Sequence, residues 1–357
     1  MRKMNRMMAG LVSAAAIVAM ITGCGGSANA GNAATTKAAG TNTAGTAIAA
    51  DASTAAAADG VYNMAYVVSS EDEWLSLLKD EVVEAAQEKG VNMEVLFSGN
   101  DAMKIIDCVE AAKSKGKDAV LINLHAAEEA QACIEAAGDD MKVVFVNREP
   151  DNKDLLNENV TVVGSDEHQS GRLQGQFLAD YFKKNGKTDV SYILIKGTDG
   201  LVHTTLRSEG VIAAMKEAGL NPVESAVVTA DYDRNTAKLE MDEVLPATEY
   251  DCIISNNDAM ALGAILAMKD AGVEPGSVPV VGIDATEDAR NALRNGEMAM
   301  TVFQSAEGQA KGAVQAAINM LEGKDLAEGT ECEVSTDNPY TLYFPFIPVT
   351  AENVDDI

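Results

Sequence analysis

The chain has 357 residues, of which 47% are hydrophobic and 23% charged, which is enough for about two domains with sizeable cores. Its 27 basic and 55 acidic residues give a net charge of −28, which argues against nucleic acid as a partner because phosphate binding needs clustered lysine and arginine. The three histidines, His125, His168 and His203, are never four residues apart, which excludes a zinc-protease helix of the His-Glu-x-x-His type.

The first 24 residues have the pattern of a secretory signal peptide. Three basic residues within the first six positions precede an uncharged apolar segment, 7–20, which is too short to span a bilayer. The segment leads into Ile21-Thr22-Gly23-Cys24, which resembles a bacterial lipobox, in which the cysteine becomes the lipidated first residue. We therefore predict a signal peptide over 1–24, a lipid anchor at Cys24 and a location at the outer face of the bacterial cytoplasmic membrane. Ordinary secretory cleavage beside an incidental cysteine is the alternative.

Residues 25–60 are almost all Ala, Gly, Thr, Asn and Ser. Such a composition cannot bury enough apolar surface to offset the entropy lost on ordering. We therefore expect a flexible tether between the anchor and a domain that begins near residue 61.

From Tyr62 onward, short apolar runs alternate with segments of helical periodicity. The runs expected to form buried strands are 64–68, 93–97, 119–124, 143–147, 160–164, 192–196, 226–229, 252–255, 278–283 and 300–303. The expected helices are 74–89, 102–115, 128–137, 169–184, 205–218, 236–245, 259–271, 287–295 and 306–321. This alternation predicts parallel sheets with helices on both faces, and so many strands favour two similar Rossmann-like α/β lobes over one sheet.

Polar and aromatic side chains gather where the predicted strands end. Ligands of open α/β sheets bind at the carboxyl ends of strands, so these segments are candidate binding loops. Their polar side chains are mainly short carboxylates and amides, with arginine and two aromatic residues, Trp74 and Tyr232, expected at loop tips. Planar polar groups can make paired hydrogen bonds to vicinal hydroxyls, and flat rings can cover the apolar faces of a sugar ring. The pattern therefore predicts a site for a neutral polyol.

Several of these segments also match a known family in chain order. The motifs are Ile122-Asn123-Leu124, Asn147-Arg148-Glu149-Pro150, Gly164-Ser165-Asp166 with Ser170-Gly171, Leu194-Ile195-Lys196-Gly197, Asn256-Asn257-Asp258-Ala259-Met260-Ala261 and Gly282-Ile283-Asp284-Ala285. Residues 61–357 thereby resemble the type I periplasmic solute-binding proteins of the ribose/galactose family, and within it the galactose/glucose-binding branch.

The resemblance implies two α/β lobes joined by a hinge of three chain segments. The crossovers would lie near Lys142–Val143, Gln304–Ser305 and Leu342–Tyr343. An N-terminal lobe would then comprise 61–142 and 305–342, and a C-terminal lobe would comprise 143–304 and 343–357.

The resemblance also implies a role for each ligand-binding position. Carboxylate, amide and guanidinium groups would bind sugar hydroxyls, Arg207 could also donate to the ring oxygen, and two rings would cover the sugar faces. The implied residues are Asp72, Trp74, Asn123, Arg207, Tyr232, Asn257, Asp284 and Gln304. Leu201 and His203 replace a histidine and an aspartate of the hexose binders, which leaves hexose specificity open and makes His203 a second-tier contact. The calcium loop of the hexose binders is absent from 185–188, and we expect no metal or cofactor.

Six of these positions have a plainer alternative. Trp74 could belong to the core at a helix start, and Tyr232 could be a solvated residue at a strand end. Asn257 and Asp284 could serve as helix N-caps and have no other role. Arg207 could be a surface ion-pair partner, and Gln304 could simply end a strand.

The predicted function is capture of a galactose- or glucose-like monosaccharide by hinged closure, with delivery to a membrane ABC importer. The same fold could instead present a sugar to a chemoreceptor or a histidine kinase. A glycan-processing enzyme is the weaker alternative, because it needs paired carboxylates with assigned acid and base roles. We expect a monomer without enzymatic activity. Without any Cys-x-x-Cys motif, we also expect Cys108, Cys133, Cys252 and Cys332 to be free thiols, with disulfides as the alternative.

Overall fold

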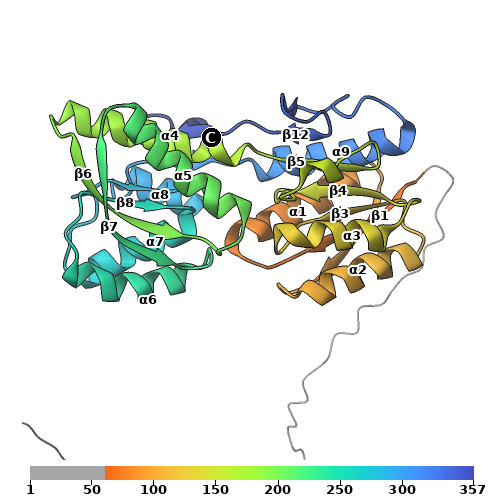
Figure 1. Ribbon diagram of the computed structural model, residues 1–357, viewed down its shortest axis with the longest axis horizontal. Helices are drawn as coiled ribbons and strands as arrows, with labels where there is room; N and C mark the ends of the chain where they lie inside the picture. Colours follow the sequence, from red (N-terminus) through yellow and green to blue (C-terminus); the bar gives the residue numbers. More distant parts are fainter. Residues whose placement is uncertain (1–60) are drawn as a thin grey trace, which may run out of the picture. The chain divides into compact units, whose positions relative to one another are not determined.

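The computed structural model describes residues 61–357, which form two α/β lobes (Figure 1). The predicted signal peptide, the lipidation site Cys24 and the tether lie outside the described residues. Within the described range, no helix is both long enough and apolar enough to cross a membrane. Cys108, Cys133, Cys252 and Cys332 are all free thiols.

The first lobe is built on a seven-stranded sheet in the order β11-β12-β5-β4-β3-β1-β2. All its neighbouring strands are parallel except β11, which pairs antiparallel with β12. The strands are β1 (Asn63–Val68), β2 (Asn92–Phe97), β3 (Ala119–Ile122), β4 (Lys142–Val146), β5 (Val160–Gly164), β11 (Glu333–Val334) and β12 (Thr341–Tyr343).

Both faces of this sheet are buried under helices. Helices α1 (Glu73–Glu88) and α9 (Ala306–Glu322) pack on one face, and α2 (Ala102–Ser114) and α3 (Ala130–Ala137) pack on the other. Along β1, Met64, Tyr66 and Val68 enter the first core, whereas Ala65 and Val67 enter the second. Because a sheet covered on both faces needs apolar residues at every position, its strands appear in the sequence as continuous apolar runs.

The second lobe has a parallel four-stranded sheet in the order β7-β6-β8-β9, with β10 and β13 forming an antiparallel pair beside it. Helices α4 and α5 cover one face, and α6, α7 and α8 cover the other. The strands are β6 (Asp189–Lys196), β7 (Asn221–Thr229), β8 (Cys252–Ser255), β9 (Val280–Val281), β10 (Thr301–Phe303) and β13 (Ile347–Val349). The helices are α4 (Glu167–Lys184), α5 (Val202–Glu217), α6 (Arg234–Val244), α7 (Asp258–Asp270) and α8 (Glu287–Arg294).

The first expected crossover, at Lys142–Val143, is wrong. Strand β4 pairs with β3, and β5 lies between β4 and β12, so both belong to the first lobe. The chain leaves this lobe only after Gly164 and enters α4 through Ser165 and Asp166. The composition of a buried strand does not say which sheet it joins, so the apolar run 160–164 was assigned to the wrong lobe.

The other two crossings follow the short strands near the carboxyl end. The chain passes from β10 to α9 through Gln304 and Ser305, and from β12 to β13 through 344–346. Strand β12 beside β5 is visible in Figure 1. By these contacts the first lobe comprises 61–164 and 306–343, and the second comprises 167–303 and 347–357.

Candidate functional site

A cavity lies between residues of the two lobes, at the carboxyl ends of their strands. It has about 330 Å³ of empty volume, including the part that is open to solvent. The lining residues are Asp72, Trp74, Leu75, Asn147, Arg148, His203, Arg207, Tyr232, Asn257, Asp284 and Gln304. Every residue predicted for the site except Asn123 is therefore brought together here.

Trp74 and Tyr232 are the aromatic residues of the cavity lining, and both are more buried than expected. Trp74, in the first turn of α1, is 6% exposed, and its indole N–H donates to the Gln304 carbonyl oxygen at 3.4 Å. Tyr232 is 8% exposed, and its hydroxyl shares a hydrogen bond of 2.9 Å with Thr204 Oγ1. Tyr232 lies in the turn after β7, as expected, whereas Trp74 lies at the start of α1, and each ring also packs in the core of its own lobe.

Tyr232 also depends on a glycine beside it. A β-carbon on Gly197 would lie 2.1 Å from Cζ of the Tyr232 ring. Only glycine therefore leaves room for the ring at the end of β6.

Asp72 is a helix cap as well as a cavity residue. Its Oδ1 accepts from the Leu75 N–H at 2.8 Å, which caps α1. Its Oδ2 accepts from Ser70 Oγ at 3.2 Å and lies 3.9 Å from the guanidinium of Arg148. The carboxylate is thus oriented by protein groups before any ligand arrives.

Asp284 is different: the residue is only 5% exposed, it lines the cavity, and its carboxylate accepts no hydrogen bond from a described residue. Burial raises its pKa well above the usual value, and the nearby Asp258 carboxylate adds to this, whereas Arg207 opposes it. The alternative that Asp284 is only a helix cap is wrong, because Thr286 caps α8 by accepting from the Ala289 N–H. Because no described residue occupies its acceptor oxygens, this carboxylate is available for a ligand that donates hydrogen bonds in the cavity.

Strained backbone is concentrated around this cavity. Six non-glycine residues in the described chain have positive φ, and five of them line the cavity or adjoin a lining residue: Asn147, Asp231, Tyr232, Asp284 and Ala285. Asp284 has φ 124°, in a region that is essentially restricted to glycine. Such strain persists where the surrounding structure enforces it, often at functional sites.

Asn257 combines both roles that were considered for it. Its side-chain oxygen accepts from the Met260 N–H at 3.0 Å and caps α7. The residue also lines the cavity, and its amide N–H₂ donors make no bond to a described residue. Capping and ligand binding are therefore compatible in this side chain.

Arg207 is buried, so the alternative of a surface ion pair is wrong. Its guanidinium donates to the Asn256 carbonyl oxygen at 2.8 Å and to Gln304 Oε1 at 3.2 Å, in addition to a buried carboxylate. Gln304 lies in the second crossover and is not merely a strand end, since its side chain binds Arg207 and its backbone oxygen binds Trp74.

His203 lines the cavity and is buried in its uncharged form. Burial is the main cause that lowers its pKa to about 4, against the opposing effect of Glu167. Its Nε2 lies 3.1 Å from the carbonyl oxygen of Asn147, so the ring links α5 of the second lobe to the end of β4 in the first.

Asn123 does not reach the cavity, which corrects its predicted role. Its side chain is fully buried, accepts from Ser69 Oγ at 2.5 Å and donates to the Val146 carbonyl oxygen at 3.2 Å. Ser69 in turn accepts from Arg148 at 3.1 Å. Asn123 therefore holds Ser69, which in turn holds the cavity residue Arg148.

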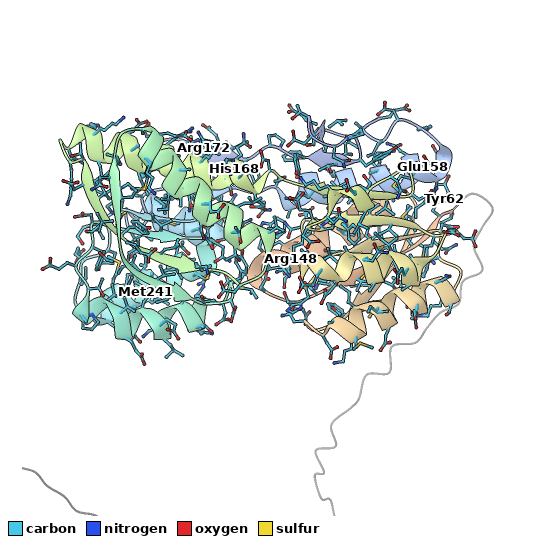
Figure 2. All side chains as sticks on the ribbon, in the orientation of Figure 1. Tyr62, Arg148, Glu158, His168, Arg172 and Met241 are labelled. Carbon is cyan, nitrogen blue, oxygen red and sulfur yellow. The ribbon has the colours of Figure 1, made fainter. Side chains whose placement is uncertain are left out.

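Three lining residues, Leu75, Asn147 and Arg148, were missing from the predicted set. Arg148 follows β4 (Figure 2), and its guanidinium also donates to the Leu124 carbonyl oxygen at 2.9 Å. Asn147 is the last residue of the predicted strand 143–147 and Arg148 directly follows it, so the strand-end rule already pointed to these two. No group of three His, Cys, Asp or Glu residues in 61–357 is arranged to hold a metal ion.

Comparisons with known proteins find relatives along most of the chain. The family model of the periplasmic binding protein domain matches residues 61–325. The D-galactose/methyl-galactoside binding periplasmic protein of Haemophilus influenzae is 31% identical over 316 residues, which cover 85% of this chain and 93% of the relative. The putative rhizopine-binding protein of Rhizobium meliloti is 32% identical over 308 residues, with coverage of 85% and 93%.

A solved structure is also similar along most of the chain. The ABC transporter solute binding protein from Bacillus halodurans, with bound myo-inositol, superposes with a TM-score of 0.73 at 28% identity. The match covers 83% of this chain and 96% of that protein.

Proposed function

The chain belongs to the periplasmic binding proteins, as a type I sugar-binding member of the ribose/galactose family, and we propose that it captures a monosaccharide or a cyclic polyol of similar size for an ABC importer. The carrying observation is the Asp284 carboxylate, which belongs to a largely buried residue of the cavity lining and has no donor among the described residues. Two adjacent ligand hydroxyls would supply the missing donors. Binding would favour the closed arrangement of the lobes, and no bond would be made or broken.

The other cavity groups support a neutral ring with several hydroxyls. Asp72 and Asn147 offer acceptors, Arg148 and Asn257 offer donors, and two aromatic residues, Trp74 and Tyr232, complete the lining. Glucose and galactose fit this description, as does the galactoside named for the Haemophilus influenzae relative.

A cyclitol is the second candidate ligand. The related Bacillus halodurans protein holds myo-inositol. Leu201 and His203 also replace two polar residues of the hexose-binding branch, so the contacts of this chain on that side of the ligand differ from those of a hexose binder. Myo-inositol has six hydroxyls and no ring oxygen, so it can donate a hydrogen bond from every ring position.

A thermal-shift panel tests the proposal. We expect at least one of D-galactose, D-glucose, D-ribose and myo-inositol to raise the melting temperature, because a ligand at 100 times its Kd stabilises the folded state by about 2.7 kcal/mol. An unchanged melting temperature with all four at millimolar concentration would contradict it. The ranking of the four decides between hexose, pentose and cyclitol.

We further propose that lipidation of Cys24 anchors the protein outside the cytoplasmic membrane. The basis is the lipobox-like segment that follows the short apolar stretch. Cells that express Cys24→Ala should release the protein from the membrane fraction with its ligand affinity intact. Retention of the variant in membranes washed with high salt would mean that the anchor lies elsewhere.

A further inference from the structure

A buried glutamate that does not line the cavity organises one side of it. Glu167 begins α4, directly after the crossover residues Ser165 and Asp166, and its side chain is 2% exposed. Sequence reasoning missed it, because a glutamate in the first turn of a helix is ordinarily a solvated residue at a favourable position of the helix dipole.

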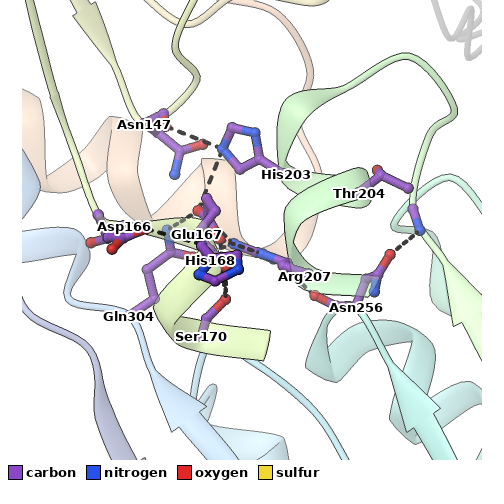
Figure 3. Close-up of polar contacts among 12 residues, drawn as sticks. Asn147, Asp166, Glu167, His168, Ser170, His203, Thr204, Arg207, Asn256 and Gln304 are labelled. Carbon is purple, nitrogen blue, oxygen red and sulfur yellow. Dashed lines mark hydrogen bonds and ion pairs between the residues drawn. The ribbon is translucent and has the colours of Figure 1, made fainter. Parts of the chain in front are cut away.

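The Glu167 carboxylate binds Arg207 through both oxygens (Figure 3). Oε2 accepts from Arg207 Nε at 2.5 Å, and Oε1 accepts from Nη2 at 2.9 Å. This fork-to-fork arrangement fixes the plane of the guanidinium as well as its position. Arg207 holds the carboxylate ionised by lowering its pKa, although burial acts in the opposite direction.

The pairing determines what Arg207 can offer to a ligand. A guanidinium has five N–H donors. The Nε–H and one Nη2–H donate to Glu167, and the other Nη2–H donates to Gln304. One Nη1–H donates to the Asn256 carbonyl oxygen. One Nη1–H is left without an acceptor among the described residues, on a side chain that lines the cavity.

The same carboxylate contacts other residues of the site. Its Oε1 also accepts from Gln304 Nε2 at 3.4 Å and lies 3.5 Å from His203 Nε2. Gln304 lies in the second crossover and accepts the indole N–H of Trp74 on its backbone oxygen. Glu167 therefore connects two of the three chain crossings with residues of both cavity walls.

We propose that Glu167 is a positioning residue of the ligand site, which turns Arg207 so that a single Nη1–H faces the ligand and holds Gln304 against it. This inference rests on the proposed function, since it assigns Arg207 to ligand recognition. A purely structural ion pair would differ in one respect: its loss would lower stability and leave the affinity of the remaining folded protein unchanged.

The test compares Glu167→Gln and Glu167→Asp with the wild-type full chain, using D-galactose and myo-inositol as probes and the fluorescence of Trp74, the single tryptophan, as the signal. Glutamine keeps the shape of the side chain and removes its charge, whereas aspartate keeps the charge and shortens the reach. We expect both variants to weaken binding about tenfold or more when measured well below their melting temperatures. Affinities within about twofold of wild type would overturn the proposal. If Glu167→Gln does not fold, Glu167→Asp decides.

Glu129→Gln is the matched control. Glu129 is also a buried glutamate, but its carboxylate accepts from the backbone N–H groups of His125 and Ala126 and does not contact Arg207. This variant should lose stability without losing affinity. An equal loss of affinity in Glu129→Gln would show that the assay reports folding and would overturn the assignment.

A measurement without ligand separates this inference from the proposed function. In a ¹⁵N–¹H spectrum of the ligand-free protein, Arg207 Nε–H should give a signal protected from exchange that is absent in Glu167→Gln and unchanged in Glu129→Gln. If the wild type binds neither probe, the function proposed for these ligands fails. The Arg207 signal then decides by itself whether Glu167 positions Arg207. A signal that persists in Glu167→Gln would overturn the positioning role.

Discussion

The two lobes place their cavity carboxylates, Asp72 and Asp284, in different surroundings. In the first lobe, Asp72 caps α1, and Arg148 donates to Ser69 and to a backbone carbonyl, so these polar groups are satisfied without a ligand. In the second lobe, the Asp284 carboxylate has no donor among the described residues and sits on backbone with φ 124°.

Because of this difference, substitutions on the two sides of the cavity should affect folding stability and ligand affinity differently. The Asp284 carboxylate makes no hydrogen bond that the fold depends on, and the strained backbone beside it costs folding free energy that a ligand does not restore. Substitutions of cavity residues in the first lobe should therefore lower both folding stability and ligand affinity. In the second lobe, a substitution at Asp284 should lower affinity without lowering stability. A substitution at Ala285 should change stability without lowering affinity.

Trp74→Ala should show the largest combined effect. Removing this buried ring of the first lobe should lower the free energy of unfolding by about 3–5 kcal/mol, as for other large-to-small core substitutions. It should also weaken ligand binding by about 1–3 kcal/mol. Circular dichroism during urea unfolding and titration calorimetry measure the two losses. Normal affinity would remove Trp74 from the binding site.

Tyr232→Ala tests the aromatic cavity residue of the second lobe. We expect binding to weaken by about 1–3 kcal/mol through loss of the ring. Tyr232→Phe is the control: it keeps the ring and loses only the hydrogen bond to Thr204, which is worth about 1 kcal/mol. Equal affinities of the two variants would mean that the ring itself does not contact the ligand.

Asp258→Asn should change the pH dependence of stability. Asp258 is fully buried beside Asp284, and burial raises its pKa from 3.8 to about 7. Because the folded state then binds this proton more tightly than the unfolded state, the contribution of Asp258 to stability is lost as pH rises from about 4 to about 7. Asparagine does not titrate, so the stability of wild type relative to the variant should fall between pH 5 and pH 7. Urea unfolding at both values measures this, and a constant difference would contradict the raised pKa.

Ala285→Gly should give the smallest change, and in the opposite direction. Ala285 has φ 53°, which glycine adopts without strain, so we expect stability to rise by up to about 1 kcal/mol with unchanged affinity. Ala136→Gly, inside α3, is the control and should lower stability by about 0.5–1 kcal/mol. A loss of stability in both variants would show that the strain at 285 is unimportant.

Local patterns in the sequence were sufficient for the helices and for most strands. Buried runs such as 64–68 and 252–255 lie within one residue of the observed strands, because strands covered on both faces must be apolar throughout. The short strands β11, β12 and β13 could not be found in this way, since β11 is exposed and each has only two or three residues. The sheet to which β5 belongs depends on pairing with β12, which is distant in the sequence.

The candidate site was predictable to a similar degree. Residues at strand ends, such as Asp284, were found because the carboxyl ends of parallel strands converge. Asn123 also follows a strand, but its side chain points under the cavity, and sequence alone does not give that direction. Glu167 was missed because its burial results from packing against α5, which no local pattern reveals.

The most direct test of the account is the paired effect of Asp284→Asn on affinity and melting temperature. Charge-assisted hydrogen bonds contribute about 1.5–3 kcal/mol each, so losing the carboxylate that accepts two hydroxyls should weaken the binding of the best ligand of the panel by about 100-fold. The ligand-free variant should melt at the same temperature as wild type or higher, because the substitution removes no hydrogen bond with a described residue. A variant that melts lower and binds with unchanged affinity would contradict the assignment of Asp284 to the ligand.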